Sequence, residues 1–259
     1  MRTSRYTLLF ALAVCVCCST VLSITYLLLR DRQEQSRQLD RQKNILLAAR
    51  LKAETEPQVE HVFASRVRPF VVDRRGVTIP DRVPDDLPKD SPLLPLYCIL
   101  PADSDVSEGV DSSLRGFPKS RDAMNRVSTG SKQPPCVSYV YPVEGLGLWG
   151  PIHGYLAVSP DGREVVGVAF YEHDETPGLG GEISQSWFQD HFVGKLLYHG
   201  ARLVGIEVVK GKARDHADFA KRGRHMVDGM SGATITGRGI TDMMRGVPAK
   251  YEPFFMRRR

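Results

Sequence analysis

The chain has 259 residues, of which 42% are hydrophobic and 25% are charged, and its formal net charge at pH 7 is +5. These proportions are ordinary for a globular protein. The charge is not accompanied by a helix-turn-helix signature or by a motif of basic and aromatic residues, so the sequence argues against nucleic-acid binding. The 5 cysteines include no CxxC pair and no Cys/His cluster with zinc spacing, so we expect no metal site.

A short basic tail, residues 1–5, precedes an uncharged segment that runs from Tyr6 to Leu29. As a helix, residues 6–29 are long enough to cross the roughly 30 Å hydrocarbon core of a bilayer. The apolar run continues past any small-residue cleavage site, so we interpret it as a retained transmembrane anchor rather than a signal peptide. Basic residues flank the segment on both sides, and the positive-inside rule therefore leaves its orientation open.

Residues 30–52 carry a weak apolar stripe at helical spacing and are predicted to form a membrane-proximal helix. Residues 53–135 contain most of the prolines of the chain, with Asp and Ser between them. Because proline removes a hydrogen-bond donor and fixes φ, we expect no stable helix there and interpret the segment as irregular chain packed on the following domain. Cys98 and Cys136 can pair in a disulfide if this part of the chain is extracytoplasmic.

Residues 136–250 have the pattern of a folded α+β domain. Segments rich in β-branched and aromatic residues predict strands at 137–143, 154–159, 164–171 and 201–211. The sequence PDGRE at residues 160–164 predicts a hairpin turn between two of these strands. Helices are predicted at 184–197 and, shorter, at 237–247. The expected fold is a twisted, mostly antiparallel sheet flanked by helices, and a basic C-terminal tail follows at residues 251–259.

Two glycine-rich stretches lie inside this domain. Residues 145–150 match the pattern GxGxxG, but the chain continues as loop and strand where a dinucleotide-binding motif requires a helix, so we reject a nicotinamide site. Residues 173–182, HDETPGLGGE, are interpreted either as a simple turn or as a loop that lays backbone amides and Thr176 against a heteroaromatic ring. The acidic side chains of Glu175 and its neighbours are expected to be solvated.

The most informative stretch is VDGMSGATITGRG, residues 227–239. Glycines and other small residues precede a predicted helix, and such a turn exposes backbone N–H groups that favour an anion such as phosphate. The stretch is not a Walker loop, because no GK[ST] follows. It is not a nucleophile elbow either, because the residue two places after Ser231 is Ala233 rather than glycine. The residues by themselves therefore indicate a phosphate site.

The same residues resemble a known family. Asp228 followed by Ser231-Gly232-Ala233-Thr234 resembles the flavinylation motif of FMN-binding domains, in which a flavin transferase bonds FMN through its phosphate to the threonine. Carried onto this chain, the resemblance implies FMN as cofactor and a phosphoester to Thr234. Thr236 is a second candidate for the attachment, although it lies outside the four-residue motif.

Three further stretches narrow the family. Residues 39–49, 145–157 and 173–183 resemble the NqrC family, which belongs to the Na⁺-translocating NADH:quinone oxidoreductases. The resemblance implies a single-pass protein of the bacterial inner membrane with its soluble domain in the periplasm. It also implies electron relay between partner membrane subunits that bear flavin and iron–sulfur centres, in a complex that couples NADH oxidation and ubiquinone reduction to Na⁺ export. This chain alone would not bind NADH.

The resemblance also implies where the flavin lies. Apolar side chains are expected to pack on the isoalloxazine ring, polar groups of the glycine-rich loop to hydrogen-bond its edge, and one lysine to lie near the ring or the phosphate. The apolar residues are Leu148, Trp149 and Leu179, the loop residues are Thr176 and Gly178, and the lysine is Lys210.

Three alternatives stay open at this point. The nearest is the flavin subunit of the related ferredoxin:NAD⁺ complex, which shares the SGAT motif and the anchor but lacks the stretch at residues 39–49. The second is an anchored binding module without redox chemistry, which would be colourless. The third is an anchored hydrolase that uses Ser231, which the missing nucleophile elbow and the missing His/Asp pair argue against.

Overall fold

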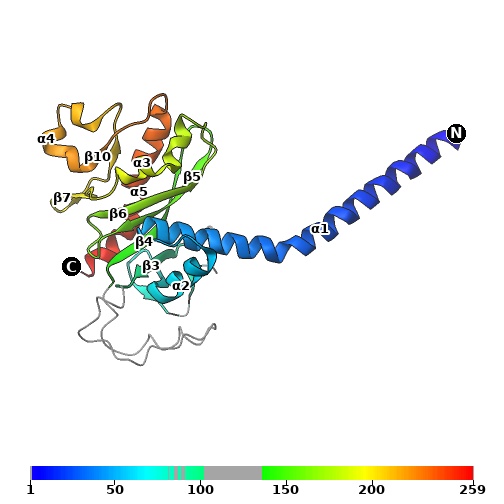
Figure 1. Ribbon diagram of the computed structural model, residues 1–259, viewed down its shortest axis with the longest axis horizontal. Coiled ribbons are helices and arrows are strands. Elements are labelled where there is room, and N and C mark those ends of the chain that lie inside the picture. Colours follow the sequence, from blue (N-terminus) through cyan, green and yellow to red (C-terminus); the bar gives the residue numbers. More distant parts are fainter. Residues whose placement is uncertain (1, 81, 85–86, 89–90, 102–135, 259) are drawn as a thin grey trace. The chain divides into compact units, whose positions relative to one another are not determined.

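The computed structural model describes residues 2–80, 82–84, 87–88, 91–101 and 136–258, and these form an α+β fold (Figure 1). The chain divides into two compact units, Met1–Gln42 and Lys43–Arg259. The first unit lies within helix α1, Arg2–Ala48, and the second contains every strand of the structure's described part.

Helix α1 contains the predicted anchor. Its segment Leu9–Arg30 is long and apolar enough to cross a membrane and has no buried residue. The hydroxyls of Thr20 and Thr25 donate to the carbonyl oxygens of Val16 and Val21, at 2.7 Å and 2.9 Å. Such internal bonds satisfy polar side chains where lipid offers no partner. The helix runs without a break as far as Ala48, so the predicted membrane-proximal helix belongs to the same element.

The second unit is built on one antiparallel sheet of six strands in the order β2-β1-β3-β4-β5-β6. The predicted hairpin turn at residues 160–164 is confirmed, because it joins β5 to β6, and Gly162 provides the positive φ of 71° that the turn needs. The strands are β1 Val67–Val72, β2 Thr78–Ile79, β3 Leu94–Ile99, β4 Ser138–Leu146, β5 Pro151–Val158 and β6 Val165–Glu172.

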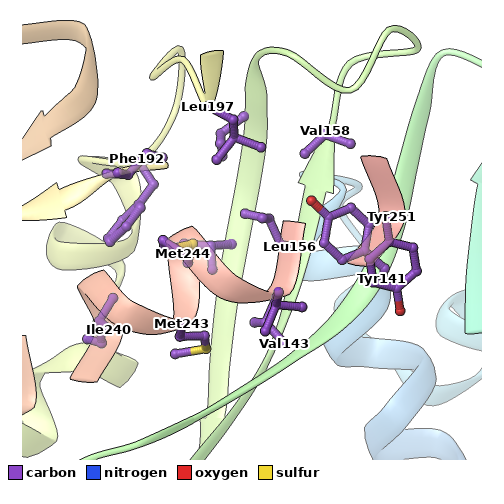
Figure 2. Close-up of a cluster of buried hydrophobic side chains, with 14 of the residues drawn as sticks. Tyr141, Val143, Leu156, Val158, Phe192, Leu197, Ile240, Met243, Met244 and Tyr251 are labelled. Carbon is purple, nitrogen blue, oxygen red and sulfur yellow. The ribbon is translucent and has the colours of Figure 1, made fainter. Parts of the chain in front are cut away.

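Helix α5, Thr234–Met256, covers one face of this sheet and packs along β4. Ile240, Met243, Met244 and Tyr251 recur at helical spacing, so one stripe of the helix is apolar and buried. Figure 2 shows this stripe against the central strands, with Met243 and Met244 beside Val143 and Leu156 and with Tyr251 next to Tyr141. The core of the second unit therefore lies between α5 and the middle of the sheet.

Two predictions for the C-terminal part were wrong. The second predicted helix, 237–247, is longer in the structure, and the predicted basic tail is mostly its continuation. Tyr251, Phe254 and Phe255 are buried in the core, and this burial stabilises helical turns that Pro248 and Pro253 would otherwise disfavour.

The proline-rich segment was also predicted wrongly where the structure describes it. It forms helix α2, Glu56–Arg66, and the first three strands. The prolines occupy tolerated positions: Pro57 lies in the first turn of α2, and Pro69 lies where β1 has a partner strand on one side only. Cys98 and Cys136 form a disulfide between β3 and the chain just before β4, and residues 102–135 lie outside the described part.

Two further elements differ from their prediction because the backbone bonds elsewhere. The predicted helix 184–197 contains only the 3₁₀ turn η5 and the short helix α3, because Gly194 and Lys195 exchange backbone hydrogen bonds with Val165 of β6. The predicted strand 201–211 is broken at Gly205, whose φ is 71°. The remaining elements are η5 Gly180–Ser184, α3 Ser186–Asp190, β7 Tyr198–His199, β8 Arg202–Leu203, β9 Glu207–Val208, η6 Ala213–Asp215, α4 Phe219–Arg222, η7 Gly223–His225 and β10 Met226–Val227.

Candidate functional site

Three loops that the sequence singled out meet at the start of α5. They are residues 147–150 between β4 and β5, residues 173–182 after β6, and the turn 228–233 before the helix. A Cβ atom added to Gly232 of the turn would lie 2.8 Å from Cδ2 of Leu179 in the second loop. A Cβ added to Gly239 of α5 would overlap the carbonyl oxygen of Leu146, at the end of β4. Glycine thus permits all three loops to approach the helix closely.

The turn before α5 leaves the helix N-terminus open. Gly232 has a φ of 73°, which turns the chain into the helix, and Ala233 is the N-cap residue. Ala233 provides no side-chain cap, so the N–H groups of the first turn keep their capacity to bind an acceptor. These N–H groups and the helix dipole together favour an anion at this position.

The two candidate threonines differ in their surroundings. Thr234 is the first residue of α5 and its side chain is exposed. Thr236 is only 1% exposed, and its hydroxyl donates a hydrogen bond to the carboxylate of Glu175. A group that must react with an external phosphate has to be accessible, so the geometry favours Thr234 over Thr236.

Large apolar side chains are exposed on the same loops. Trp149 is 68% exposed, and Leu148 and Leu179 are about half exposed. Ile235, beside Thr234, is exposed too and was not foreseen, because one apolar residue in a helix carries no signal of its own. Apolar side chains gathered on the surface are typical of a ligand-binding face. Thr176 and Gly178 are exposed in the same loop as Leu179, and space is open around Gly178.

Lys210 and Thr234 line the same cavity, which has a volume of about 350 Å³. Its wall also contains Arg238, Asp242 and Arg245, which follow one another along one face of α5. Arg238 lies one turn after Thr234, so helical spacing identifies it as a neighbour, but the sequence analysis did not select it. The cationic side chains favour a phosphate group in this cavity.

Asp228 has a bracing role in the structure. Its Oδ1 accepts the backbone N–H of Ala213 at 2.8 Å, which ties the turn before α5 to the loop that follows Lys210. Asp228 also faces Lys195, where burial lowers the pKa of the ammonium group and the nearby carboxylate partly opposes this shift. The predicted motif therefore includes one residue that positions the loops of the site.

The expectation that the acids of the 173–182 loop are solvated was wrong for Glu175, which is only 5% exposed. Nothing in the local sequence distinguishes Glu175 from Asp174, because its partners come from two distant segments. The formal GxGxxG stretch leads into strand β5, as expected, and not into a helix. No group of three or more His, Cys, Asp or Glu side chains in the structure's described ranges is arranged to hold a metal ion.

Comparison with known proteins gives the class. A family model for the FMN-binding domain matches residues 147–247, which span all three loops and most of α5. The fold and the site thus define an FMN-binding domain.

Relatives along nearly the whole chain give the particular family, NqrC, a component of the Na⁺-translocating NADH-quinone reductase. The relative from Pseudomonas aeruginosa is 33% identical over 248 residues, covering 92% of this chain and 88% of that protein. The relative from Vibrio campbellii is 33% identical over 228 residues, covering 86% and 82%. The crystal structure of the same component from Parabacteroides distasonis superposes with a TM-score of 0.67 at 25% identity, covering 88% of this chain and 96% of that one. The chain belongs to the NqrC family of the Na⁺-translocating NADH-quinone reductases.

Proposed function

We propose that this chain carries FMN in phosphoester linkage to Thr234 and transfers electrons within a Na⁺-translocating NADH-quinone reductase. One observation carries the proposal: Thr234 presents an exposed hydroxyl at the first position of an uncapped helix, on a cavity that Lys210 also lines. A phosphate bonded there would accept hydrogen bonds from the open N–H groups of the first helical turn.

The residues present fit both ends of FMN. Ser231, Gly232 and Ala233 form the turn that exposes the helix N–H groups, and Lys210 and Arg238 add positive charge beside Thr234. Leu148, Trp149, Leu179 and Ile235 provide exposed apolar surface for the isoalloxazine ring, and Thr176 and the amide of Gly178 provide polar groups for its edge. Bound FMN supplies reversible uptake and release of electrons.

The protein's own contribution is to hold and orient the cofactor. The apolar side chains exclude water from one side of the ring, and the cationic side chains balance the charge of the phosphate. A covalent bond prevents loss of the cofactor in any redox state, which suits a relay. We infer that a flavin transferase makes this bond, and that electrons come from and pass to flavin and iron–sulfur centres in other membrane subunits of the complex.

We further propose that the protein is a single-pass component of the bacterial inner membrane with its flavin domain in the periplasm. The segment Leu9–Arg30 supports the anchor. The Cys98–Cys136 disulfide supports the orientation, because disulfides persist in the periplasm and are rare in the reducing cytosol. Nicotinamide binding is assigned to another subunit of the complex.

The proposal is tested by the position of the flavin. The full chain is made in cells that contain a flavin transferase, separated on a denaturing gel and viewed under ultraviolet light. We expect a fluorescent band, with the mass of FMN on the peptide that contains Thr234. Thr234→Ala should give a dark band with unchanged folding, since loss of an exposed hydroxyl typically changes stability by less than about 0.5 kcal/mol.

The matched control is Ser231→Ala, which removes another exposed hydroxyl from the same turn and should leave the band fluorescent. Covalent flavin that persists in Thr234→Ala, or disappears in Ser231→Ala with Thr234 intact and the chain folded, would contradict the assignment.

A further inference from the structure

Glu175 is a buried carboxylate that joins three segments of the site. Its Oε1 accepts the backbone N–H groups of Leu148 at 2.7 Å and of Trp149 at 3.0 Å. Its Oε2 accepts the hydroxyl of Thr236 in the first turn of α5. Glu175 itself lies in the loop after β6 and is only 5% exposed. Both of its oxygen atoms are therefore used to connect the 147–150 loop and the helix to the 173–182 loop.

The backbone around Glu175 leaves space for this carboxylate. A Cβ atom added to Gly147 would overlap its Oε1, and a Cβ added to Gly180 would overlap its Oε2. These two glycines come from the two different loops that the sequence analysis selected. None of the salt bridges among the described residues includes Glu175, so the carboxylate acts through hydrogen bonds from two backbone amides and one hydroxyl.

The partners of Glu175 place it between the two ends of the cofactor. Thr236 lies two residues after Thr234, the proposed attachment point. Leu148 and Trp149 carry exposed apolar side chains that are proposed to contact the ring. A phosphoester restrains only the phosphate end of FMN, because the ribityl chain between phosphate and ring contains several rotatable single bonds. The orientation of the ring must therefore be fixed by the loops, and the loops are held to the helix by Glu175.

We propose that Glu175 is the positioning residue that fixes the isoalloxazine ring relative to its covalent anchor, an inference that rests on the proposed function. The carboxylate does this by holding the 147–150 loop and the first turn of α5 in one arrangement. Without it, two backbone donors and one hydroxyl lose their acceptor, and the loop that carries Trp149 is released from the helix. FMN would remain bonded to Thr234, but its ring would sample several orientations.

The test compares the flavin in four variants of the full, flavin-loaded chain in detergent. Glu175→Ala removes the acceptor, whereas Glu175→Gln keeps the length, offers one oxygen to both backbone donors and offers an N–H group to Thr236. Thr236→Val removes only one of the three hydrogen bonds and serves if Glu175→Ala does not fold. Glu172→Ala is the matched control, because it removes a nearby exposed acid.

The readouts are covalent FMN content on a denaturing gel, circular dichroism in the visible flavin bands, and flavin fluorescence anisotropy. We expect full covalent FMN in every variant. Glu175→Ala should lose most of the visible dichroism and lower the anisotropy, Thr236→Val should do so partly, and Glu175→Gln and Glu172→Ala should match the wild-type chain.

The outcomes separate the inference from the proposed function. Wild-type dichroism and anisotropy in Glu175→Ala, or in Thr236→Val if that is the variant that folds, would overturn the positioning role. Equal loss in Glu175→Gln and Glu175→Ala would overturn it as well, because the hydrogen-bonding shape would then not be what matters. A wild-type chain without covalent flavin would instead overturn the proposed function, and the inference with it.

Discussion

Gly232 is the residue at which a backbone requirement and the proposed flavin site coincide. Its φ of 73° lies in the left-handed region, where a residue with a side chain is destabilised by about 1–2 kcal/mol. A Cβ atom there would also lie 2.8 Å from Cδ2 of Leu179, so the loop that carries Leu179 would have to shift. We predict that Gly232→Ala lowers both the stability and the covalent FMN content of the chain.

Gly211→Ala is the control for this prediction. Gly211 has a similar φ of 77°, but a Cβ atom there meets nothing within 4 Å. It should therefore show the same backbone cost of about 1–2 kcal/mol in urea denaturation while keeping its flavin. Equal FMN content in the two variants, measured by absorbance after denaturation, would show that contact with Leu179 does not matter for flavin loading.

At the same scale, the sequence predicts Thr234 but not Glu175. The motif around Thr234 is contiguous, so its small residues and glycines are visible together in the sequence. The importance of Glu175 arises from Leu148, Trp149 and Thr236, which reach it only after the chain has folded. Local sequence distinguishes a residue by its neighbours in the chain, whereas burial is decided by neighbours in space.

At the scale of the element, α5 connects the site to the core, and its glycines are not equivalent. A Cβ atom on Gly239 would overlap the carbonyl oxygen of Leu146, a backbone atom that cannot move independently of β4. Overpacking of this kind costs about 1–3 kcal/mol. We therefore predict that Gly239→Ala destabilises the second unit and loosens the 147–150 loop, which urea denaturation and flavin anisotropy would measure.

Gly246 lies on the same helix, is exposed and has open space around its Cα. Gly246→Ala should stabilise the chain by up to about 1 kcal/mol, because alanine loses less conformational entropy in a helix than glycine does. If both substitutions stabilised the chain, close packing at Gly239 would be ruled out as the reason for its glycine.

The elements that sequence predicts well are those whose signals are local. The strands between residues 137 and 171 follow from β-branched and aromatic residues and from the turn PDGRE. The length of α5 does not follow, because Pro248 and Pro253 normally end a helix and only burial of Tyr251 and Phe254 offsets their effect. Helix α2 was missed because Pro57 was taken as a helix breaker, although proline is tolerated in a first turn.

At the scale of the whole molecule, charge and covalent chemistry give different information about the membrane. Basic residues on both sides of the anchor leave its orientation open in the sequence. The pairing of Cys98 with Cys136 depends on the adjacent strands β3 and β4, which the sequence analysis did not place together. The disulfide therefore supplies a physical argument for the periplasmic side that is independent of the family resemblance.

Global stability should depend on alkaline pH through two tyrosines in the core. Tyr141 of β4 and Tyr251 of α5 stack with ring centroids 4.2 Å apart (Figure 2). Burial raises the pKa of both phenols, and for Tyr141 the neighbouring Tyr251 and Tyr198 add to the effect. Below the ordinary tyrosine pKa of about 10 both phenols are neutral in the folded and unfolded chains, so their full contribution to stability is present.

Above about pH 10 the unfolded chain loses these protons first, so the folded state binds more protons and its stability falls as pH rises. Each phenol should contribute a slope of about 1.4 kcal/mol per pH unit. Tyr251→Phe should reduce this slope by one proton's share. It should also lower stability at pH 7 by about 1 kcal/mol, because the hydroxyl of Tyr251 donates to the carbonyl oxygen of Pro95 at 3.0 Å. Urea denaturation of both chains between pH 7 and pH 11 would measure both effects, and an unchanged slope in Tyr251→Phe would mean that Tyr251 does not link proton binding to folding.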